Sequence, residues 1–221
     1  MKLRFVILGL VFLSLVVLPS CESDAEKQMR LARIEKERIE NEKQQAEKER
    51  QRKLKEAEEA RLRAIKKEKE RREREIYNRY INNSLYTGAT PYSYCFGSNS
   101  NCDDYGCSKI KVITPYNSDV LVSIKRNGKV FRHAYIKAGS SYTFEFPNGT
   151  YQAFFYYGKG WNPNKFMKKT SCGILRGGFI TNEHVGKDNP QSLYNNILTY
   201  ELILQRNGNF NTQSSSTNEA F

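Results

Sequence analysis

The sequence predicts an α+β fold in which one long, charged α-helix precedes a small antiparallel β-sandwich. Three observations predict it: an apolar leader occupies residues 1–20, helix-forming residues without Gly or Pro fill residues 24–82, and β-rich runs alternate with turn signals beyond residue 83. We therefore divide the chain into a signal peptide (1–20), a helical stalk (21–82), a β domain (83–211) and a polar tail (212–221). We expect the tail to be disordered, because it is polar from Thr212 to Ala220.

The leader has the pattern of a secretory signal peptide. Lys2 and Arg4 precede an apolar run from Phe5 to Leu18, in the order of the charged and apolar regions of such signals. The run is shorter than the approximately 20 apolar residues, about 30 Å of helix, that span a bilayer. We therefore expect export rather than a transmembrane helix, with an uncleaved N-terminal anchor as one alternative and a conventionally cleaved, soluble protein as another.

The end of the leader resembles the lipobox of bacterial lipoproteins. Leu18, Pro19 and Ser20 lead into Cys21, and Pro19 departs from the small residue usual at its position. The resemblance implies that the Cys21 thiol carries diacylglycerol, that cleavage occurs before Cys21 and that the new amine is acylated, often with palmitate. Several acyl chains anchor a protein stably to a membrane. An acidic stretch at 22–26 is similar to the export signals of surface lipoproteins in Bacteroidota and favours the outer membrane.

Opposite charges four residues apart support the helix expected over residues 24–82. The pairs Glu49–Lys53 and Glu59–Arg63 are two of many, and each contributes a few tenths of a kcal/mol. A heptad register that gathers the alanines leaves Lys and Arg at many core positions, so a coiled coil would be weak and an isolated helix is favoured. We expect a stalk of about 80 Å; a fluctuating charged tether is the alternative.

Six β-rich runs predict the strands of the C-terminal domain. Asn127-Gly128 and Asn148-Gly149 each stand between two of these runs, and this dipeptide favours the tight turn of a hairpin. Val120, Val122 and Ile124 alternate as in a half-buried strand. The expected strands are Lys109–Thr114, Asp119–Lys125, Lys129–Ile136, Ser141–Phe146, Thr150–Tyr157 and Leu198–Gln205.

One part of this domain resembles the extracytoplasmic β-sandwich modules of the PEGA and carboxypeptidase-regulatory type. The resemblance rests on Ala138-Gly139, on Tyr142 and Phe144, and on the run from Pro147 to Tyr151. It covers about 25 residues and implies a small sandwich fold without specifying a function.

The remaining four cysteines are Cys95, Cys102, Cys107 and Cys172. In an oxidising compartment the default is two disulfides, of which three pairings are possible. A four-cysteine zinc site is the alternative, although no second short cysteine pair completes it.

The sequence contains no arrangement of residues typical of an enzyme. Neither His133 nor His184 has a motif partner, and Asp103-Asp104 is more typical of a solvated loop than of a calcium site. We expect no catalytic residue, no metal and no cofactor beyond the lipid on Cys21. The net charge of +12 is spread among interleaved acids and bases, which argues against a nucleic-acid partner.

These patterns predict a non-enzymatic cell-envelope lipoprotein whose stalk presents a β-sandwich that binds or positions an envelope or surface partner. One alternative is a carbohydrate-binding surface module, in which Tyr156, Tyr157, Trp161 and Asn162 would contact a sugar. In that alternative Trp161 is exposed, whereas in the competing interpretation it covers the core. Another alternative is a spacer anchored in the inner membrane that spans the periplasm.

Overall fold

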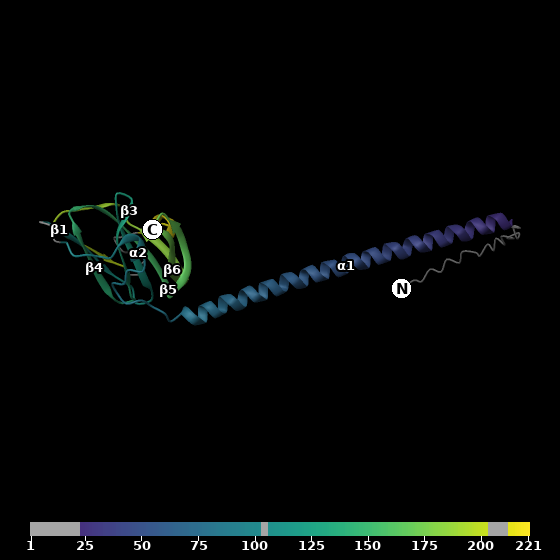
Figure 1. The fold of residues 1–221 in the computed structure, drawn as a ribbon, viewed down its shortest axis with the longest axis horizontal. Coiled ribbons are helices and arrows are strands. Elements are labelled where there is room, and N and C mark those ends of the chain that lie inside the picture. Colours follow the sequence, from purple (N-terminus) through teal and green to yellow (C-terminus); the bar gives the residue numbers. More distant parts are fainter. Residues whose placement is uncertain (1–22, 103–105, 203–211) are drawn as a thin grey trace, which may run out of the picture. The chain divides into compact units, whose positions relative to one another are not determined.

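A computed structural model describes residues 23–102, 106–202 and 212–221 (Figure 1). The chain separates into two units, residues 1–66 and residues 67–221. The predicted α+β class is confirmed, since one long helix precedes a region of nine strands. The elements are α1 (Asp24–Tyr80), α2 (Ser93–Phe96), β1 (Cys107–Ile113), β2 (Asp119–Arg126), β3 (Lys129–Ile136), β4 (Ser141–Pro147), β5 (Gly149–Thr170), β6 (Gly173–Lys187), β7 (Gln191–Leu193), β8 (Ile197–Glu201), β9 (Gln213–Ser214) and α3 (Thr217–Ala220).

Helix α1 is 57 residues long and begins with a capping box. The Ser23 hydroxyl accepts a hydrogen bond from the Glu26 N–H at 3.4 Å, and the Glu26 carboxylate accepts one from the Ser23 N–H at 3.1 Å. These two bonds satisfy backbone donors that have no partner within the helix. The predicted helix is confirmed over almost its whole length.

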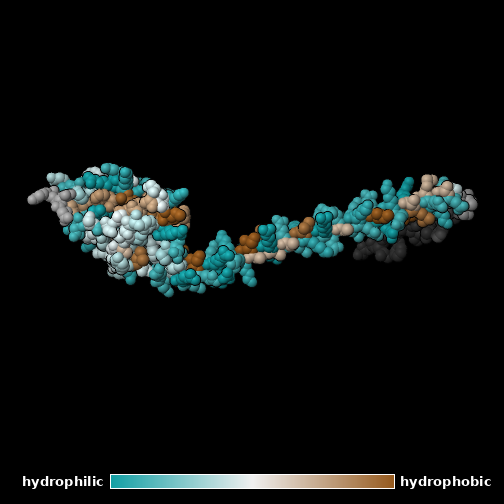
Figure 2. Space-filling view, in the orientation of Figure 1, coloured by the Kyte–Doolittle hydropathy of each residue, from teal (hydrophilic) through white to brown (hydrophobic). Residues whose placement is uncertain are grey.

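The surface of α1 is charged and no residue of the helix is buried. The predicted pairs Glu49–Lys53 and Glu59–Arg63 form at 2.8 and 3.4 Å, and Arg71 lies between Glu68 and Glu75 with ion pairs to both. Figure 2 shows isolated apolar side chains within this mostly hydrophilic surface. Charge pairing along the helix therefore stabilises it locally, and the expectation that it does not pair with a second helix stays a prediction.

The strands form two sheets. A three-stranded sheet has the order β4-β1-β8, and a six-stranded sheet has the order β3-β2-β5-β6-β9, with β7 paired to β5. The six-stranded sheet is antiparallel throughout, as expected. In the other sheet β1 and β8 are parallel, so the expectation of a wholly antiparallel domain is wrong for this pair. The two strands are distant in sequence, so no local turn signal could predict whether they pair in a parallel or an antiparallel direction.

Only one of the two predicted Asn-Gly hairpins exists. Asn127 and Gly128 have φ values of 52° and 75° and join β2 to β3, which pair with each other. Asn148-Gly149 instead joins β4 in the three-stranded sheet to β5 in the six-stranded sheet. The Asn148 side chain accepts hydrogen bonds from the Ser108 hydroxyl at 2.7 Å and the Asn195 N–H at 2.8 Å. The second dipeptide therefore marks a crossover between sheets.

Two hydrophobic cores lie on opposite faces of the six-stranded sheet. Val120, Val122 and Ile124 of β2 lie in the first core with residues of the three-stranded sheet, whereas Leu121, between them, lies in the second. Strand β5 alternates in the same way, with Phe155 in the first core and Phe154 in the second. Burial on both faces explains why apolar residues occupy consecutive positions in these two strands.

The tail is ordered where the structure describes it, so the predicted disorder is wrong. Helix α3 has Ser216 as its N-cap, and Ala220 and Phe221 are buried in the second core. The Phe221 ring meets that of Tyr92 edge-on with centroids 5.1 Å apart, and the Ser123 hydroxyl donates to the Ala220 carbonyl at 2.7 Å. The buried Ala220 and Phe221 therefore hold an otherwise polar segment against the domain.

Five of the expected strands agree closely with β1–β5 at their starts, and β8 covers the first part of the sixth. Residues 203–205 of that sixth prediction lie outside the described residues. The sequence did not predict that β5 continues to Thr170 or that β6 returns from Gly173 to Lys187.

Candidate functional site

The extended hairpin of β5 and β6 presents an exposed face made of both apolar and basic side chains. Across this antiparallel pair Phe166 is opposite Arg176, and Lys169 is opposite Ile174. Opposite residues share a face, as do residues two apart on one strand, so these four side chains lie on the same face. All four are exposed, Phe166 by 59% and Ile174 by 41%. We call these four residues the hairpin face.

Helix α2 holds the end of the hairpin in place. Cys95 of α2 and Cys172 in the hairpin turn lie at disulfide distance, with Cα atoms 5.4 Å apart. The Tyr94 hydroxyl donates to the Ile174 carbonyl at 2.9 Å and accepts from the Arg176 N–H at 3.2 Å. The cross-link and these two hydrogen bonds together restrict the motion of the strand that carries half of the hairpin face.

Tyr94 also occupies the edge of β6 at this position. The carbonyl of Ile174 and the N–H of Arg176 are backbone groups that an added strand would need for pairing. Because the tyrosine hydroxyl already bonds to both of them, strand addition at this edge would require breaking both hydrogen bonds. The hairpin face, rather than the strand edge, is therefore the accessible feature.

The predicted sugar-stacking residues do not form an exposed platform. Trp161 is 2% exposed and Tyr156 is fully buried, both in the second core, while Tyr157 is only partly buried. The Trp161 ring meets Tyr135 and Phe179 edge-on, each with centroids 5.4 Å away. The expectation of an exposed platform is therefore wrong for Tyr156 and Trp161, whose rings pack in the second core. The position of Trp161 agrees with the competing interpretation, in which it covers the core.

Asn162 and the hydroxyl of Tyr156 serve the local structure of the hairpin. The Asn162 side-chain oxygen Oδ1 accepts a hydrogen bond from the Asn164 N–H at 2.9 Å, next to an irregularity in the pairing of β5 and β6. The Tyr156 hydroxyl donates to Glu183 at 2.8 Å and accepts from the Phe179 N–H at 3.1 Å. Burial raises the pKa of Tyr156 above its usual range, so this hydroxyl stays protonated.

The other two cysteines of the domain form a second disulfide-distance pair. Cys102 and Cys107 have Cα atoms 6.0 Å apart. Of the three pairings that the sequence left open, the structure thus brings together Cys95 with Cys172 and Cys102 with Cys107. The predicted calcium candidates Asp103 and Asp104 lie outside the described residues, as does the predicted lipidation site Cys21. Among the described residues no three metal-binding side chains cluster.

The two histidines lie in different environments. His133 is fully buried, and its Nε2 atom accepts a hydrogen bond from the Tyr92 N–H at 3.0 Å. Burial lowers the pKa of His133 to about 4, so the ring is neutral near pH 7. His184 is exposed beside Tyr157, with ring centroids 5.9 Å apart. His133 thus packs in the interior of the β domain.

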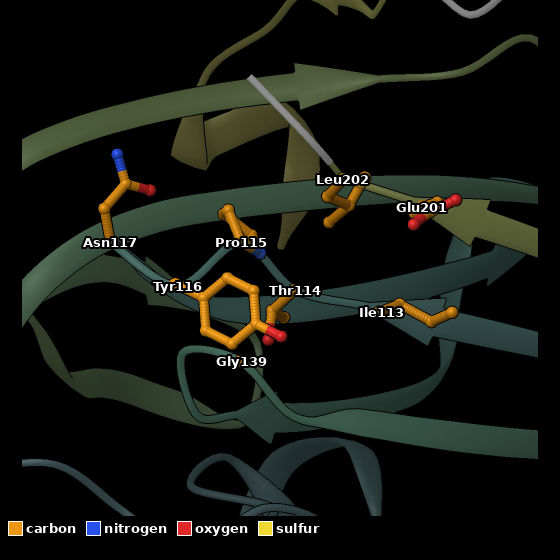
Figure 3. A pocket seen from close by; sticks show the side chains of 8 residues that line it. All are labelled: Ile113, Thr114, Pro115, Tyr116, Asn117, Gly139, Glu201 and Leu202. Carbon is orange, nitrogen blue, oxygen red and sulfur yellow. The ribbon is translucent and has the colours of Figure 1, made fainter. Parts of the chain in front are cut away.

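A pocket of about 300 Å³ lies beside the loop between β1 and β2 (Figure 3). Tyr116 lies over Gly139 in this view, and a Cβ atom at Gly139 would approach the Tyr116 ring to 2.7 Å. The Thr114 hydroxyl already donates to the Ser140 carbonyl at 3.0 Å. Glu201 carries the only carboxylate among the lining residues that the structure describes. The lining residues are Ile113, Thr114, Pro115, Tyr116, Asn117, Gly139, Glu201 and Leu202.

A scan against protein-family models finds none that matches this chain, and a search of curated proteins finds no similar sequence. Within the described ranges, no helix is both long and apolar enough to cross a bilayer.

The sequence did not single out the residues of the hairpin face, nor Tyr94. A signal for them existed, because Lys165, Lys168, Lys169 and Arg176 occur without any acidic residue between residues 163 and 178. The apolar residues among them could not be assigned to one face without the register, which contains irregularities between Asn162 and Lys168.

Proposed function

We propose that this chain is an exported lipoprotein of the cell envelope, anchored by lipid on Cys21, in which a helical spacer presents a β domain to an envelope or surface partner. The observation that carries the proposal is the order of Lys2, Arg4, the apolar run to Leu18 and then Cys21. A charged start and a short apolar region are the parts of a secretory signal, and the resemblance to the lipobox places the lipid on the cysteine that follows after Pro19 and Ser20.

The properties of α1 support its role as a spacer. At 1.5 Å per residue, its 57 residues would extend for about 85 Å. No residue of the helix is buried, and its ion pairs join residues three or four apart within the helix itself. A helix stabilised in this way keeps its length without needing a partner along its sides.

The β domain supports the role of the binding part. Its two cores are built from residues beyond 84, so its folding depends on its own side chains. We further propose a β-sandwich architecture, which is favoured by the contribution of both sheets to the first core, with the Phe155 ring 5.1 Å from that of Tyr200. We do not retain sugar binding through Tyr156 and Trp161, because both rings are buried.

The proposal is tested by labelling bacteria that express the full chain with radioactive palmitate. We expect the wild-type protein to take up label and to lose its leader, and the Cys21→Ala variant to keep its leader and remain unlabelled. Ser20→Ala is the matched control, because it retains a small residue before the cysteine, and it should behave as wild type. Label that persists in Cys21→Ala would refute lipidation at this residue. Separation of inner and outer membranes distinguishes the outer-membrane protein from an inner-membrane spacer.

A further inference from the structure

We propose that the hairpin face, Phe166, Lys169, Ile174 and Arg176, docks onto the surface of an anionic phospholipid bilayer. This inference deepens the proposed function by naming the surface that the β domain meets. It does not depend on Cys21, because the face lies entirely within the β domain.

Charge complementarity is the first argument. Between residues 163 and 178 the chain carries Lys165, Lys168, Lys169 and Arg176 and no acidic residue. Lys165 pairs with Glu183, and Lys168 donates to the Asn218 carbonyl at 2.7 Å. Among the described residues, Lys169 and Arg176 form no ion pair, and both are exposed. These two cations are available to phosphate groups, and each basic residue at an anionic membrane surface contributes about 1 kcal/mol.

The apolar members of the face argue for a bilayer rather than for a soluble polyanion. Phe166 and Ile174 lie on the same face as the two cations and are 59% and 41% exposed. A soluble polysaccharide phosphate would engage the two cations and leave the two apolar side chains without a contact. A bilayer interface accepts both kinds of group, since apolar side chains enter the boundary of the acyl chains while Lys and Arg remain with the headgroups.

Contacts with helix α2 hold the backbone of the hairpin face in a fixed position. Cys172 is linked to Cys95, and the Tyr94 hydroxyl bonds to the backbone on both sides of Leu175, which is buried. The face is therefore held in place before it meets a ligand, so docking costs little conformational entropy. Tyr94 is itself 57% exposed at the edge of the hairpin, where an aromatic ring with a polar end is suited to a membrane interface.

The test uses residues 21–221 with Cys21→Ser, so that no lipid anchor is present, and measures co-sedimentation with vesicles. We expect binding to vesicles of equal parts phosphatidylglycerol and phosphatidylcholine, little binding to phosphatidylcholine alone, and weaker binding as salt is raised. Lys169→Gln with Arg176→Gln should lower the partition coefficient about 30-fold, from about 1 kcal/mol for each cation. Phe166→Ser with Ile174→Ser should lower it by about tenfold or more.

Matched variants elsewhere on the domain control for total charge and total apolar surface. Lys129→Gln with Lys137→Gln removes two exposed cations, and Ile197→Ser removes an exposed apolar side chain. Both should bind vesicles as the parent does. Equal loss in the charge control would overturn the assignment of the face. Unchanged binding by Phe166→Ser with Ile174→Ser would show that charge alone binds the vesicles, and it would overturn the proposed docking of the apolar side chains into the bilayer.

A spectroscopic variant tests insertion without removing a contact. Trp161 is the single tryptophan of the chain and is 2% exposed, so lipid should not alter its emission. Phe166→Trp should show a blue shift on anionic vesicles and quenching by brominated acyl chains, neither of which the parent shows. Absence of quenching would contradict the proposal. If the vesicle experiments fail while Cys21 of the native protein is lipidated, only the docking face is rejected. If the β domain binds vesicles while Cys21 of the native protein is unmodified, only the lipoprotein assignment is rejected.

Discussion

His133 is enclosed by aromatic rings in a position that suits only its neutral form. Tyr92 and Phe96 lie with ring centroids 5.9 and 5.8 Å from its own, and its Nε2 atom accepts the Tyr92 N–H. A protonated ring has no acceptor nitrogen and would lose this hydrogen bond. Burial accordingly lowers its pKa from 6.5 to about 4.

This pKa predicts a loss of stability in mild acid. The unfolded chain binds the proton more tightly than the folded chain, so the stabilisation is complete above pH 6.5 and is lost as the pH falls from 6.5 towards 4. The loss is on the order of 3 kcal/mol. Glu145 and Glu219 have pKa values lowered from 4.5, so protonation of these two side chains lowers the stability only at a pH below this range.

Urea unfolding of wild type and His133→Gln across this pH range checks the prediction. The glutamine retains an acceptor for the Tyr92 N–H and does not titrate. We expect the variant to lose most of the pH dependence between 6.5 and 4. The same slope in both proteins would show that other groups cause it.

Trp161 and Phe166 lie five residues apart on β5 and should respond differently to truncation. Trp161→Ala removes a buried ring and should lower the free energy of unfolding by about 3–5 kcal/mol. Phe166→Ala removes an exposed ring and should change it by less than about 0.5 kcal/mol. Denaturant unfolding measures the free energy of unfolding of both variants. A similar loss in the two variants would contradict the burial of Trp161 and the exposure of Phe166.

At the scale of elements, the two cysteine pairs close loops of very different length. Cys95 and Cys172 are 77 residues apart in sequence, and Cys102 and Cys107 are 5 apart. Loop-closure entropy predicts that Cys95→Ser with Cys172→Ser costs about 4 kcal/mol, and that Cys102→Ser with Cys107→Ser costs about 2 kcal/mol. Unfolding of the two double variants under oxidising conditions tests this order. A reversed order would count against the pairing or against the entropic account of it.

Helix α1 should be helical as an isolated peptide of residues 24–80. Its ion pairs join residues three or four apart, and it buries no residue in the full structure. Circular dichroism should show a mainly helical peptide whose helicity falls modestly as salt screens the pairs, and sedimentation should show a monomer. A peptide that is mostly unfolded at physiological salt would remove the stalk and leave a flexible tether.

Elements with local signals were predictable from the sequence. Helix propensity and charges four apart predicted α1, and the Asn127-Gly128 turn predicted the hairpin of β2 and β3. The continuation of β5 was not predicted, because Gly158, Gly160 and Pro163 are typical of a loop. The strand accommodates them through irregular pairing, and Gly160 adopts a φ of +70°.

The hairpin face depends on that register, so its four residues could not be assembled from the sequence. The tail contained a usable signal, since Ser216 and Glu219 have the spacing of a helix cap. Its burial is a long-range effect of Phe221 packing against Tyr92, and such contacts leave no periodic pattern in ten residues.

At the scale of the whole molecule, the proposed lipoprotein combines a lipid anchor, a helical spacer and a disulfide-linked β domain. Each part has a separate physical basis: acyl chains partition into a bilayer, α1 is stabilised by charges within itself, and the β domain folds around its own two cores. Both disulfides require an oxidising compartment, which an exported protein reaches. The parts are therefore consistent with a single location outside the cytoplasm.

The intact mass of the protein extracted from bacterial membranes, before and after reduction, tests this account most directly. We predict a chain that begins at Cys21, carries the mass of several acyl chains, and gains four hydrogen atoms when the Cys95–Cys172 and Cys102–Cys107 disulfides are reduced. A chain that begins at Met1, or one that begins at an unmodified residue, would contradict the lipid anchor and the location that we derive from it.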